Sequence, residues 1–355
     1  MIKRTLYFGN PAYLSTTNEQ LVVEFPVPKA GPAPLSTSGE GSGVRSQTPS
    51  PSEVYPDPSS GRAGVRSTAP IEDIGVLILD NQQITISQAL IAKLLANNTA
   101  LITCDNTHHP VGLLLNLDGN TLQSRIFTAQ VEASEPLKKQ LWQQTIIAKI
   151  QNQAAVLGMQ NPSGSLFNAP DKSLLNFTKD VKSGDSDNTE AKAAGYYWRN
   201  LFTNIPLSFG EGRGEVFTRD REGDPPNNLL NYGYAILRAI VARSLVGSGL
   251  LPTLGIHHRN QYNAYCLADD IMEPYRPYVD KIVCEIVETQ YFASNPNEGF
   301  LSITPGIKKQ MLAIPAMDVM IDDQNSPMMN AIQRTTSSLA KCYEGKARKI
   351  LYPVI

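Results

Sequence analysis

Residues 255–277 read GIHHRNQYNAYCLADDIMEPYRP, and this stretch gathers many ionisable side chains in a short length of chain. It contains two of the four histidines, three carboxylates and two arginines, although only 18% of all residues are charged. These residues are His257, His258, Asp269, Asp270, Glu273, Arg259 and Arg276. Such crowding requires a structural or a chemical explanation.

The carboxylates of this stretch fall on a predicted helix. The apolar residues of about 266–273 have helical spacing, and a proline follows only after the last carboxylate. Asp270 and Glu273 are three residues apart and would share one face of that helix. One imidazole, that of His258, together with several carboxylates favours Mg²⁺ or Mn²⁺ over a structural Zn²⁺. The alternative is a capped surface helix whose charges are solvated.

Length and composition limit the function classes. At 355 residues the chain is long enough for two domains, each with its own core. The formal net charge of -2 provides no overall attraction to nucleic acid, so DNA binding would depend on local basic patches. The four cysteines form no C-x-x-C pair and are typical of reduced, buried thiols. The N-terminus has no signal-peptide pattern, and the longest apolar region, 232–251, contains two arginines, so we expect a soluble cytoplasmic protein.

The first third of the chain is predicted to form a small β-rich domain, residues 1–118. Strands are expected at 5–8, 20–25, 71–80, 99–105 and 111–115, with a helix over 87–96. Residues 28–70 are dominated by Pro, Ser and Gly and read as a low-complexity insertion, with a regulatory or partner-binding tail as the alternative. His108 and His109 have no carboxylate cluster beside them, which favours a loop or substrate contact over a metal site.

From residue 121 the apolar pattern becomes helical. Helices are expected at 126–133, 136–155, 191–201, 228–246, 274–288, 308–314 and 330–342. The chain is therefore predicted to have an α+β fold, in which a larger all-α domain over 119–355 carries the metal site.

Two further groups of side chains could complete a site. Glu190 follows a polar loop and begins a predicted helix, where the helix dipole alone would favour a carboxylate. A set of arginines could bind the phosphates of DNA, although solvated faces would explain some of them equally well. These are Arg219, Arg221, Arg238, Arg259 and Arg276.

Several separated motifs resemble one known family. They are the first eight residues, Glu190 followed by A-A-x-Y-Y-W at 193–198, P-N-x-L-L-N-Y-G-Y at 226–234, and the 255–277 stretch. In this order they are similar to the CRISPR-associated adaptation integrase Cas1, in particular to the versions that accompany type II (Cas9) systems. The resemblance covers the chain apart from 28–70 and a shorter insertion near 207–215.

The resemblance implies a metal site and a reaction. Glu190, His258 and Glu273 would be the catalytic metal ligands, with Asp270 as a neighbouring acid that could share the role. His258 is preferred to His257 because the family's metal histidine directly precedes a basic residue and an asparagine. The reaction would join the 3′-hydroxyl of a short DNA fragment to a phosphodiester at the edge of a CRISPR repeat by transesterification, with Mg²⁺ or Mn²⁺ as cofactor. Water in place of the hydroxyl would give endonuclease activity.

The resemblance also implies partners. The family forms a homodimer through its N-terminal domain, and two dimers flank a dimer of the small protein Cas2; Cas9 is a further candidate partner. The 28–70 insertion would then have to loop away from the dimer region. Two other classes stay open: a metal-dependent nuclease or phosphodiesterase that needs no partner, and a DNA-binding scaffold without catalysis, in which replacing Glu190 or His258 would leave DNA chemistry unchanged.

Overall fold

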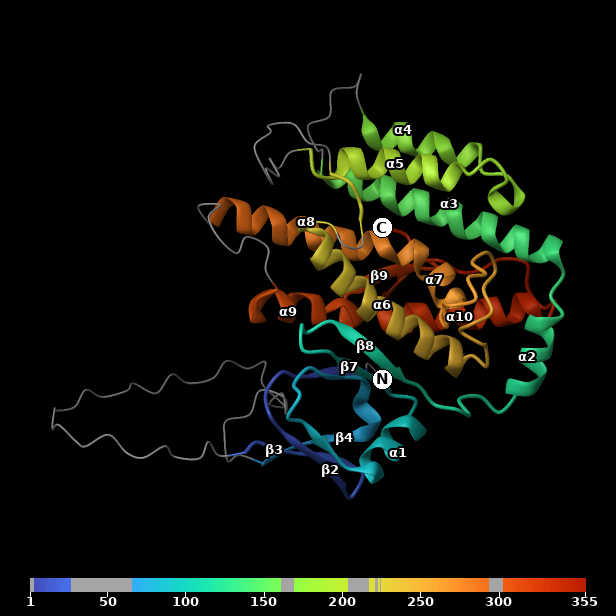
Figure 1. Cartoon of the computed structure of the whole chain (residues 1–355). Coiled ribbons are helices and arrows are strands. Elements are labelled where there is room, and N and C mark those ends of the chain that lie inside the picture. Colours follow the sequence, from blue (N-terminus) through green and yellow to red (C-terminus); the bar gives the residue numbers. More distant parts are fainter. Residues whose placement is uncertain are drawn as a thin grey trace.

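The computed structural model describes residues 3–26, 66–160, 169–203, 217–220, 223, 225–293 and 303–355. Most of the strands lie at the N-terminal end of the molecule and most of the helices in the rest, as Figure 1 shows. The prediction of a β-rich N-terminal region followed by a helical one is therefore confirmed. The predicted insertion lies almost wholly outside the described residues.

The N-terminal region contains two four-stranded sheets. The first has the order β1-β5-β7-β8 and is parallel except for its β7–β8 pair, and the second has the order β4-β3-β2-β6. The strands are β1 (Arg4–Phe8), β2 (Tyr13–Thr17), β3 (Gln20–Glu24), β4 (Arg66–Pro70), β5 (Ile74–Leu79), β6 (Thr85–Ile86), β7 (Ala100–Cys104) and β8 (Pro110–Leu114). Helix α1 (Gln88–Ala96) connects the sheets and begins at Ser87, whose hydroxyl accepts the Leu90 N–H.

Two predictions from the sequence are wrong, one on a boundary and one on the content of the C-terminal region. The segment 28–70 was assigned to the insertion as a whole, but Arg66–Pro70 forms β4, which pairs antiparallel with β3 and buries Ala69. Short, small and polar side chains gave this edge strand no apolar alternation to detect. The C-terminal region is also not all-α, because β9 (Asp318–Ile321) and β10 (Gln324–Pro327) form an antiparallel hairpin within it.

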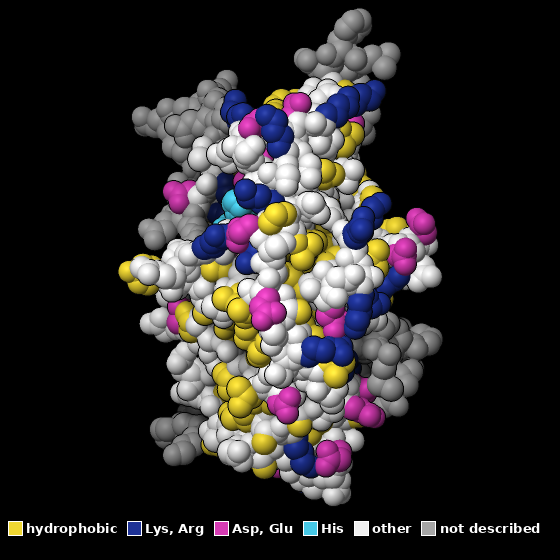
Figure 2. Space-filling model, turned by 90° about the vertical axis from the view of Figure 1, so that its right-hand side faces the viewer, with side chains coloured by type: hydrophobic (Ala, Val, Ile, Leu, Met, Phe, Trp, Pro, Cys, Tyr) yellow, Lys and Arg dark blue, Asp and Glu magenta, His cyan; other side chains and the backbone are white. Residues whose placement is uncertain are grey.

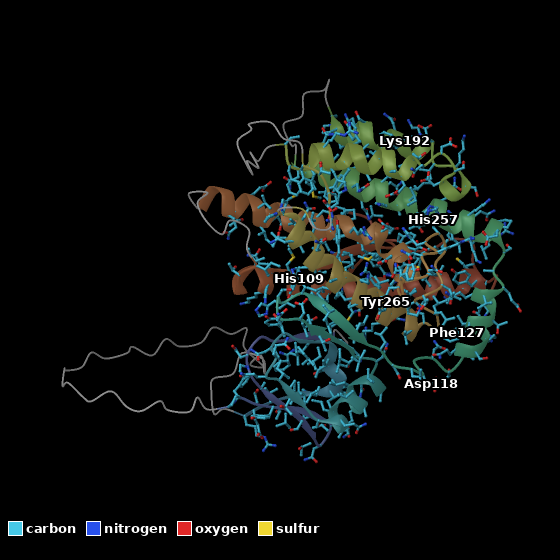
Figure 3. The ribbon with its side chains drawn as sticks, viewed as in Figure 1. His109, Asp118, Phe127, Lys192, His257 and Tyr265 are labelled. Atoms are coloured by element: carbon cyan, nitrogen blue, oxygen red, sulfur yellow. The ribbon has the colours of Figure 1, made fainter. Side chains whose placement is uncertain are left out.

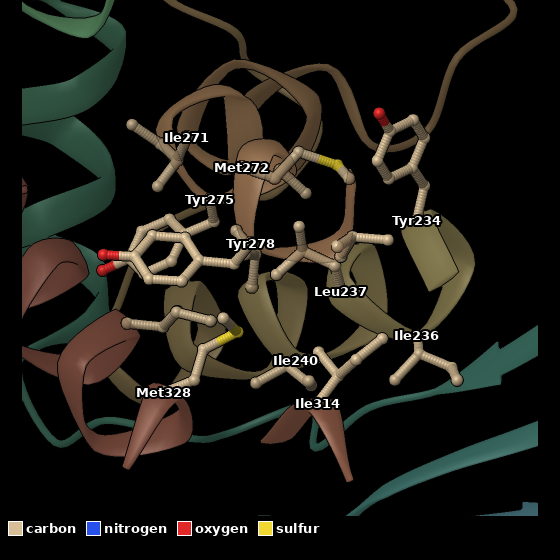
Figure 4. Packing of buried hydrophobic residues seen from close by; sticks show 14 of the residues in the cluster. Tyr234, Ile236, Leu237, Ile240, Ile271, Met272, Tyr275, Tyr278, Ile314 and Met328 are labelled. Atoms are coloured by element: carbon tan, nitrogen blue, oxygen red, sulfur yellow. The ribbon is translucent and has the colours of Figure 1, made fainter. Parts of the chain in front are cut away.

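The helices of the C-terminal region pack around α6. They are α2 (Gln123–Val131), α3 (Glu135–Gln160), α4 (Pro170–Asn176), α5 (Thr189–Leu201), α6 (Asn227–Gly247), α7 (Cys266–Met272), α8 (Arg276–Ala293), α9 (Pro305–Leu312) and α10 (Met328–Tyr343). Figure 4 shows Leu237 and Ile240 of α6 among side chains from α7, α8 and the start of α10. Helix α6 is long and apolar enough to cross a membrane, yet 83% of its most apolar window is buried inside the protein, as in a core helix.

The first sheet separates two hydrophobic cores. Val76 and Ile78 of β5 belong to the buried cluster of the helices, whereas Leu77 between them belongs to the cluster between the two sheets. Alternate residues of a strand point to opposite faces, so β5 serves both cores. The division at 118/119 stays a prediction, because the helical core continues onto this face of the sheet.

A buried carboxylate joins three of the helices. Asp280 on α8 is 1% exposed and accepts hydrogen bonds from the hydroxyls of Tyr197 on α5, at 2.9 Å, and of Tyr234 on α6. Burial raises the pKa of Asp280 to about 7, although both hydroxyls and Arg276 act against the shift. Asp280 therefore changes charge near neutral pH without leaving the core.

Asp280 should make the stability of the fold depend on pH. Its pKa is higher in the folded state than the value of about 3.9 expected for an unfolded aspartate, so folding takes up a proton between about pH 4 and about pH 7. Stability should fall as pH rises through this range, by on the order of 4 kcal/mol in total. Asp280→Asn should remove this slope, as measured by urea unfolding at several pH values. An unchanged slope in the variant would assign the pH dependence to other groups.

Candidate active site

Two carboxylates that are far apart in the sequence meet at one ammonium group. Lys149 Nζ, on the buried side of α3, contacts Glu190 Oε1 and lies 2.6 Å from Glu273 Oε2. Burial by itself would lower the pKa of Lys149, but the Glu273 and Glu190 carboxylates outweigh this effect and raise it. The structure thus brings together two glutamates that are 83 residues apart and that the family resemblance grouped, with a cation between them.

Glu190 is fixed by the way α5 begins. The carboxylate of Asp185 accepts the backbone N–H of Thr189 at 2.8 Å and that of Glu190 at 3.0 Å, and so satisfies two N–H groups that the first turn of a helix leaves without partners. Asp185 and Asn188 adopt positive φ angles of 50° and 53°, which turn the chain sharply into the helix. The side chain of Glu190 is 28% exposed, so it can be reached from solvent.

Glu273 lies where α7 passes into α8, in a short 3₁₀ turn over Glu273–Tyr275. The amide of Asn152 on α3 holds this turn, because its Nδ2 donates to the Pro274 carbonyl at 2.8 Å. Arg276 Nη2 lies 3.1 Å from Glu273 Oε1. Burial would raise the pKa of Glu273, but Arg276 and Lys149 outweigh it and hold the pKa below its usual value. Glu273 is therefore ionised at neutral pH although its side chain is only 6% exposed.

Asp270 organises the histidine loop that precedes α7. Its carboxylate accepts three successive backbone N–H groups, from Ile256 at 2.6 Å, His257 at 2.9 Å and His258 at 3.3 Å. Its Oδ1 also lies 2.5 Å from His258 Nδ1. A Cβ on Gly255 would come within 2.3 Å of a backbone carbonyl oxygen in this loop, so only glycine fits there. Both oxygens of Asp270 are thus used inside the loop, which suits an orienting role.

The two adjacent histidines differ in environment. His258 is tied to Asp270 through Nδ1, and this hydrogen bond raises its pKa, leaving Nε2 as the free ring nitrogen. His257 lies flat on Trp142 of α3, with ring centroids 4.3 Å apart and planes within 2°. Burial lowers the pKa of His257. Figure 3 places His257 beside α3, and Figure 2 shows histidine at the surface between basic and acidic side chains.

The predicted DNA-binding arginines are mostly paired with other groups. Arg238 Nε lies 2.7 Å from Asp269, and Arg259 Nη2 lies 2.6 Å from the exposed Glu135 at the start of α3. The guanidinium groups of Arg219 and Arg276 lie 5.4 and 5.0 Å from the ring centre of Tyr234. Arg221 lies outside the described residues.

A cleft opens beside His258. It has a volume of about 460 Å³ and is lined by residues of α2, α3 and the 253–263 loop, among them Gln130, Lys138, Arg259, Asn260 and Asn263. Amide and cationic side chains are therefore among the groups that line the approach to the histidine.

Among the described residues, no three His, Cys, Asp or Glu side chains stand close enough to hold an ion in this arrangement. Lys149 keeps the carboxylates of Glu190 and Glu273 apart, since its ammonium lies between them. The donor set nevertheless fits a hard divalent cation, because it offers carboxylate oxygens and an imidazole. Glu273 Oε2 supports the fit: it is buried and, although Lys149 lies near, it accepts no aligned hydrogen bond.

Sequence reasoning missed three residues of this site: Lys149, Asp185 and Asn152. The signal for Lys149 was available. Trp142, Ile146 and Gln153 repeat at helical spacing on the buried side of α3, and Lys149 falls within that stripe, where a lysine without a partner would be costly. A buried stripe that contains a lysine predicts a nearby carboxylate.

Comparison with known proteins places this chain in a family. The model of the CRISPR associated protein Cas1 family matches residues 60–313. The chain belongs to the Cas1 family. It is 36% identical over 293 residues to the CRISPR-associated endonuclease Cas1 of Neisseria meningitidis, covering 82% of this chain and 88% of that protein. The CRISPR-associated endonuclease Cas1 2 of Pyrobaculum aerophilum is 27% identical over 64% of this chain and 76% of its own length.

Solved structures share the Cas1 fold of this chain. A casposase bound to integration product superposes with a TM-score of 0.71 at 20% identity, covering 99% of this chain and 92% of that one. A Cas6-RT-Cas1–Cas2 complex superposes with a TM-score of 0.65 at 17% identity, covering 98% of this chain and 36% of its own. The mixed α/β architecture is thus that of Cas1 proteins.

Proposed function

We propose that this Cas1 protein is a metal-dependent DNA integrase that joins the 3′-hydroxyl of short DNA fragments to the CRISPR repeat. One observation carries the proposal: Glu190 at the start of α5 and Glu273 at the junction of α7 and α8 converge on one cation, and Glu273 lies within electrostatic range of His258, whose ring Asp270 orients. Relatives named as CRISPR-associated endonucleases and a fold neighbour that is a casposase bound to integration product support this choice over a scaffold without catalysis.

The reaction conserves the number of phosphodiester bonds. The incoming 3′-oxygen forms a bond to phosphorus while the bond to the repeat's own 3′-oxygen breaks, so no nucleotide cofactor is required. When bound, Mg²⁺ or Mn²⁺ held by Glu190, His258 and Glu273 would polarise the phosphate and favour the deprotonated hydroxyl. Asp270 keeps the proton of His258 on Nδ1 and presents Nε2 as the ligand.

The basic residues around this site would orient the DNA. Arg276 lies next to Glu273 and beside the Tyr234 ring, so it is held in a fixed position near the reacting phosphate. Arg259 and Lys138 line the cleft at His258, where a DNA backbone could displace the exposed Glu135 from Arg259. Arg219, Arg221 and Arg238 are proposed to contact phosphates farther from the metal.

We further propose that the protein works with itself and with Cas2. The net charge of -2 gives a single subunit no overall attraction to DNA, so a long basic path would have to be assembled across several subunits. The Cas6-RT-Cas1–Cas2 neighbour is consistent with a Cas2 partner. Homodimerisation through the N-terminal sheets, contact with Cas9 and a cytoplasmic location belong to the same proposal.

Chelation of the metal should abolish strand transfer. A labelled short duplex with free 3′-hydroxyls is incubated with a plasmid that bears the cognate repeat, Cas2 and Mg²⁺ or Mn²⁺. Joined product should form with either ion, disappear with EDTA and return when the ion is restored, because the carboxylate and imidazole ligands favour such ions.

Glu190→Gln keeps the size of the side chain but removes the charge, so it should give no joined product at any metal concentration tested. Lys192→Met, two residues later on the exposed side of α5, serves as the matched control and should keep it. Joining that persists in EDTA would overturn the metal-dependent proposal, and cleavage of free strands without joining would favour a nuclease.

A further inference from the structure

We propose that Lys149 is a built-in cation that occupies the metal position and must be displaced when the metal binds. The inference rests on the proposed function, because it takes Glu190 and Glu273 as metal ligands. Its evidence is positional: one ammonium group touches a carboxylate oxygen of each glutamate, 2.6 Å from Glu273. A divalent ion that used the same two oxygens would need the volume that Nζ now fills.

The charges around Lys149 already balance. Glu190 and Glu273 carry two negative charges, and Lys149 and Arg276, which lies 3.1 Å from Glu273, carry two positive charges. A divalent ion added to this group would leave a net charge of +2 in a largely buried site, where like charges repel strongly. Removing the ammonium from the site halves this excess. Repulsion and lack of space therefore act in the same direction.

Lys149 is also suited to move. Its charge sits at the end of four methylene groups that can swing without disturbing α3, and an ammonium is a compact, well-hydrated point charge. The Glu190 side chain is 28% exposed, so the ammonium could move past it towards solvent or towards a DNA phosphate. Arg276 lacks this freedom, because its guanidinium is held beside Tyr234.

If the metal must displace Lys149, this residue affects both the stability of the metal-free protein and the affinity for the metal. Without metal it holds two carboxylates together that would otherwise repel each other, so it stabilises the metal-free protein. With metal it must be expelled, so it weakens metal binding. Removing Lys149 should therefore destabilise the metal-free protein and tighten its binding of Mn²⁺.

The test measures equilibrium binding of Mn²⁺ by the electron paramagnetic resonance signal of the free ion. Lys149→Met should lower the Kd for Mn²⁺ at least about tenfold relative to wild type. It should also lower the melting temperature without metal and show a larger increase when Mn²⁺ is added. Lys192→Met removes the same charge from the exposed side of α5 and should leave the Kd within about twofold.

His258→Ala and Glu190→Gln separate failure of this inference from failure of the proposed function. If both weaken Mn²⁺ binding but Lys149→Met binds as the wild type or more weakly, Lys149 is a permanent part of the site and the inference is wrong. If neither variant weakens Mn²⁺ binding, the ion lies elsewhere, and the proposed metal site is wrong together with the inference.

If Lys149→Met does not fold, an experiment on the wild-type protein tests the inference instead. Amine acylation followed by mass spectrometry measures how accessible each lysine is. Lys149, whose side chain is 8% exposed, should be acylated slowly without metal and several-fold faster with saturating Mn²⁺, while acylation of Lys192 stays constant. Equal, slow acylation of Lys149 in both conditions would overturn the displacement.

Discussion

Replacing His258 with alanine should reduce strand transfer at least about a hundredfold, because it removes a proposed metal ligand. His257→Ala should keep most of the activity. The two residues are adjacent, yet their surroundings separate them: His258 Nδ1 lies 2.5 Å from the Asp270 carboxylate, whereas His257 is stacked on Trp142. The measurement is the initial rate of joining of labelled duplex into a repeat plasmid, at saturating Mg²⁺ and with Cas2.

The Asp270→Asn variant, measured in the same assay, tests whether Asp270 orients His258 or binds the metal itself. An asparagine can still accept backbone N–H groups through its one oxygen, but it no longer provides a charged partner for His258 Nδ1. Loss of such an orienting carboxylate costs about 10- to 100-fold in metal affinity or activity, less than loss of the ligand. A His257→Ala variant that is inactive while His258→Ala joins DNA normally would reverse the assignment. Asp270→Asn as inactive as His258→Ala would favour Asp270 as a ligand.

The fold could be predicted wherever one pattern dominated. Helices such as α6 and α10 bury a regular apolar stripe, and their predicted ranges, 228–246 and 330–342, differ from Asn227–Gly247 and Met328–Tyr343 by three residues or fewer at either end. The short strands resisted prediction. β2 and β4 are five residues long, are stabilised by pairing with β3, and carry threonine and serine that also signal turns. Pairing across the chain is not visible in a local window.

The residues of the candidate site that belong to sequence motifs could be predicted, and those that meet them only through folding could not. Glu190, His258 and Glu273 are separated in sequence and were grouped by their motifs, and the structure brings the two glutamates to one point. Lys149 could not be assigned to them, because spacing along α3 shows which side is buried but not what it meets. Asp185 was hidden for the opposite reason: it lies in a polar loop with several possible capping residues, and only the hydrogen bonds that its carboxylate accepts from the Thr189 and Glu190 N–H groups distinguish it.

Asp80→Ala should cost the fold about 3–5 kcal/mol, because it leaves a buried lysine without its counter-charge. Asp80 follows β5, is 2% exposed, and accepts hydrogen bonds from Tyr7 of β1, from His108 Nδ1 at 2.8 Å and from Lys308 Nζ at 2.6 Å. Lys308 belongs to α9, and its side chain is 9% exposed, so this one carboxylate joins the first sheet to the helices. The predicted loss is a large part of the roughly 5–15 kcal/mol that stabilises a typical fold.

Urea unfolding at neutral pH measures this loss, and two variants test its cause. His108→Ala should cost less than about 1 kcal/mol, because the His108 side chain is 55% exposed. Asp80→Ala combined with Lys308→Met should regain most of the stability, since no unpaired charge then stays buried. Burial would raise the pKa of Asp80, but Lys308, Tyr7 and His108 outweigh it and hold the pKa below its usual value. The stabilisation of the fold by the ionised Asp80 carboxylate is therefore complete above the unfolded pKa of about 3.9, and it is lost as the pH falls below that value. A double variant no more stable than Asp80→Ala would show that the carboxylate acts through Tyr7 and the sheet rather than through the ion pair.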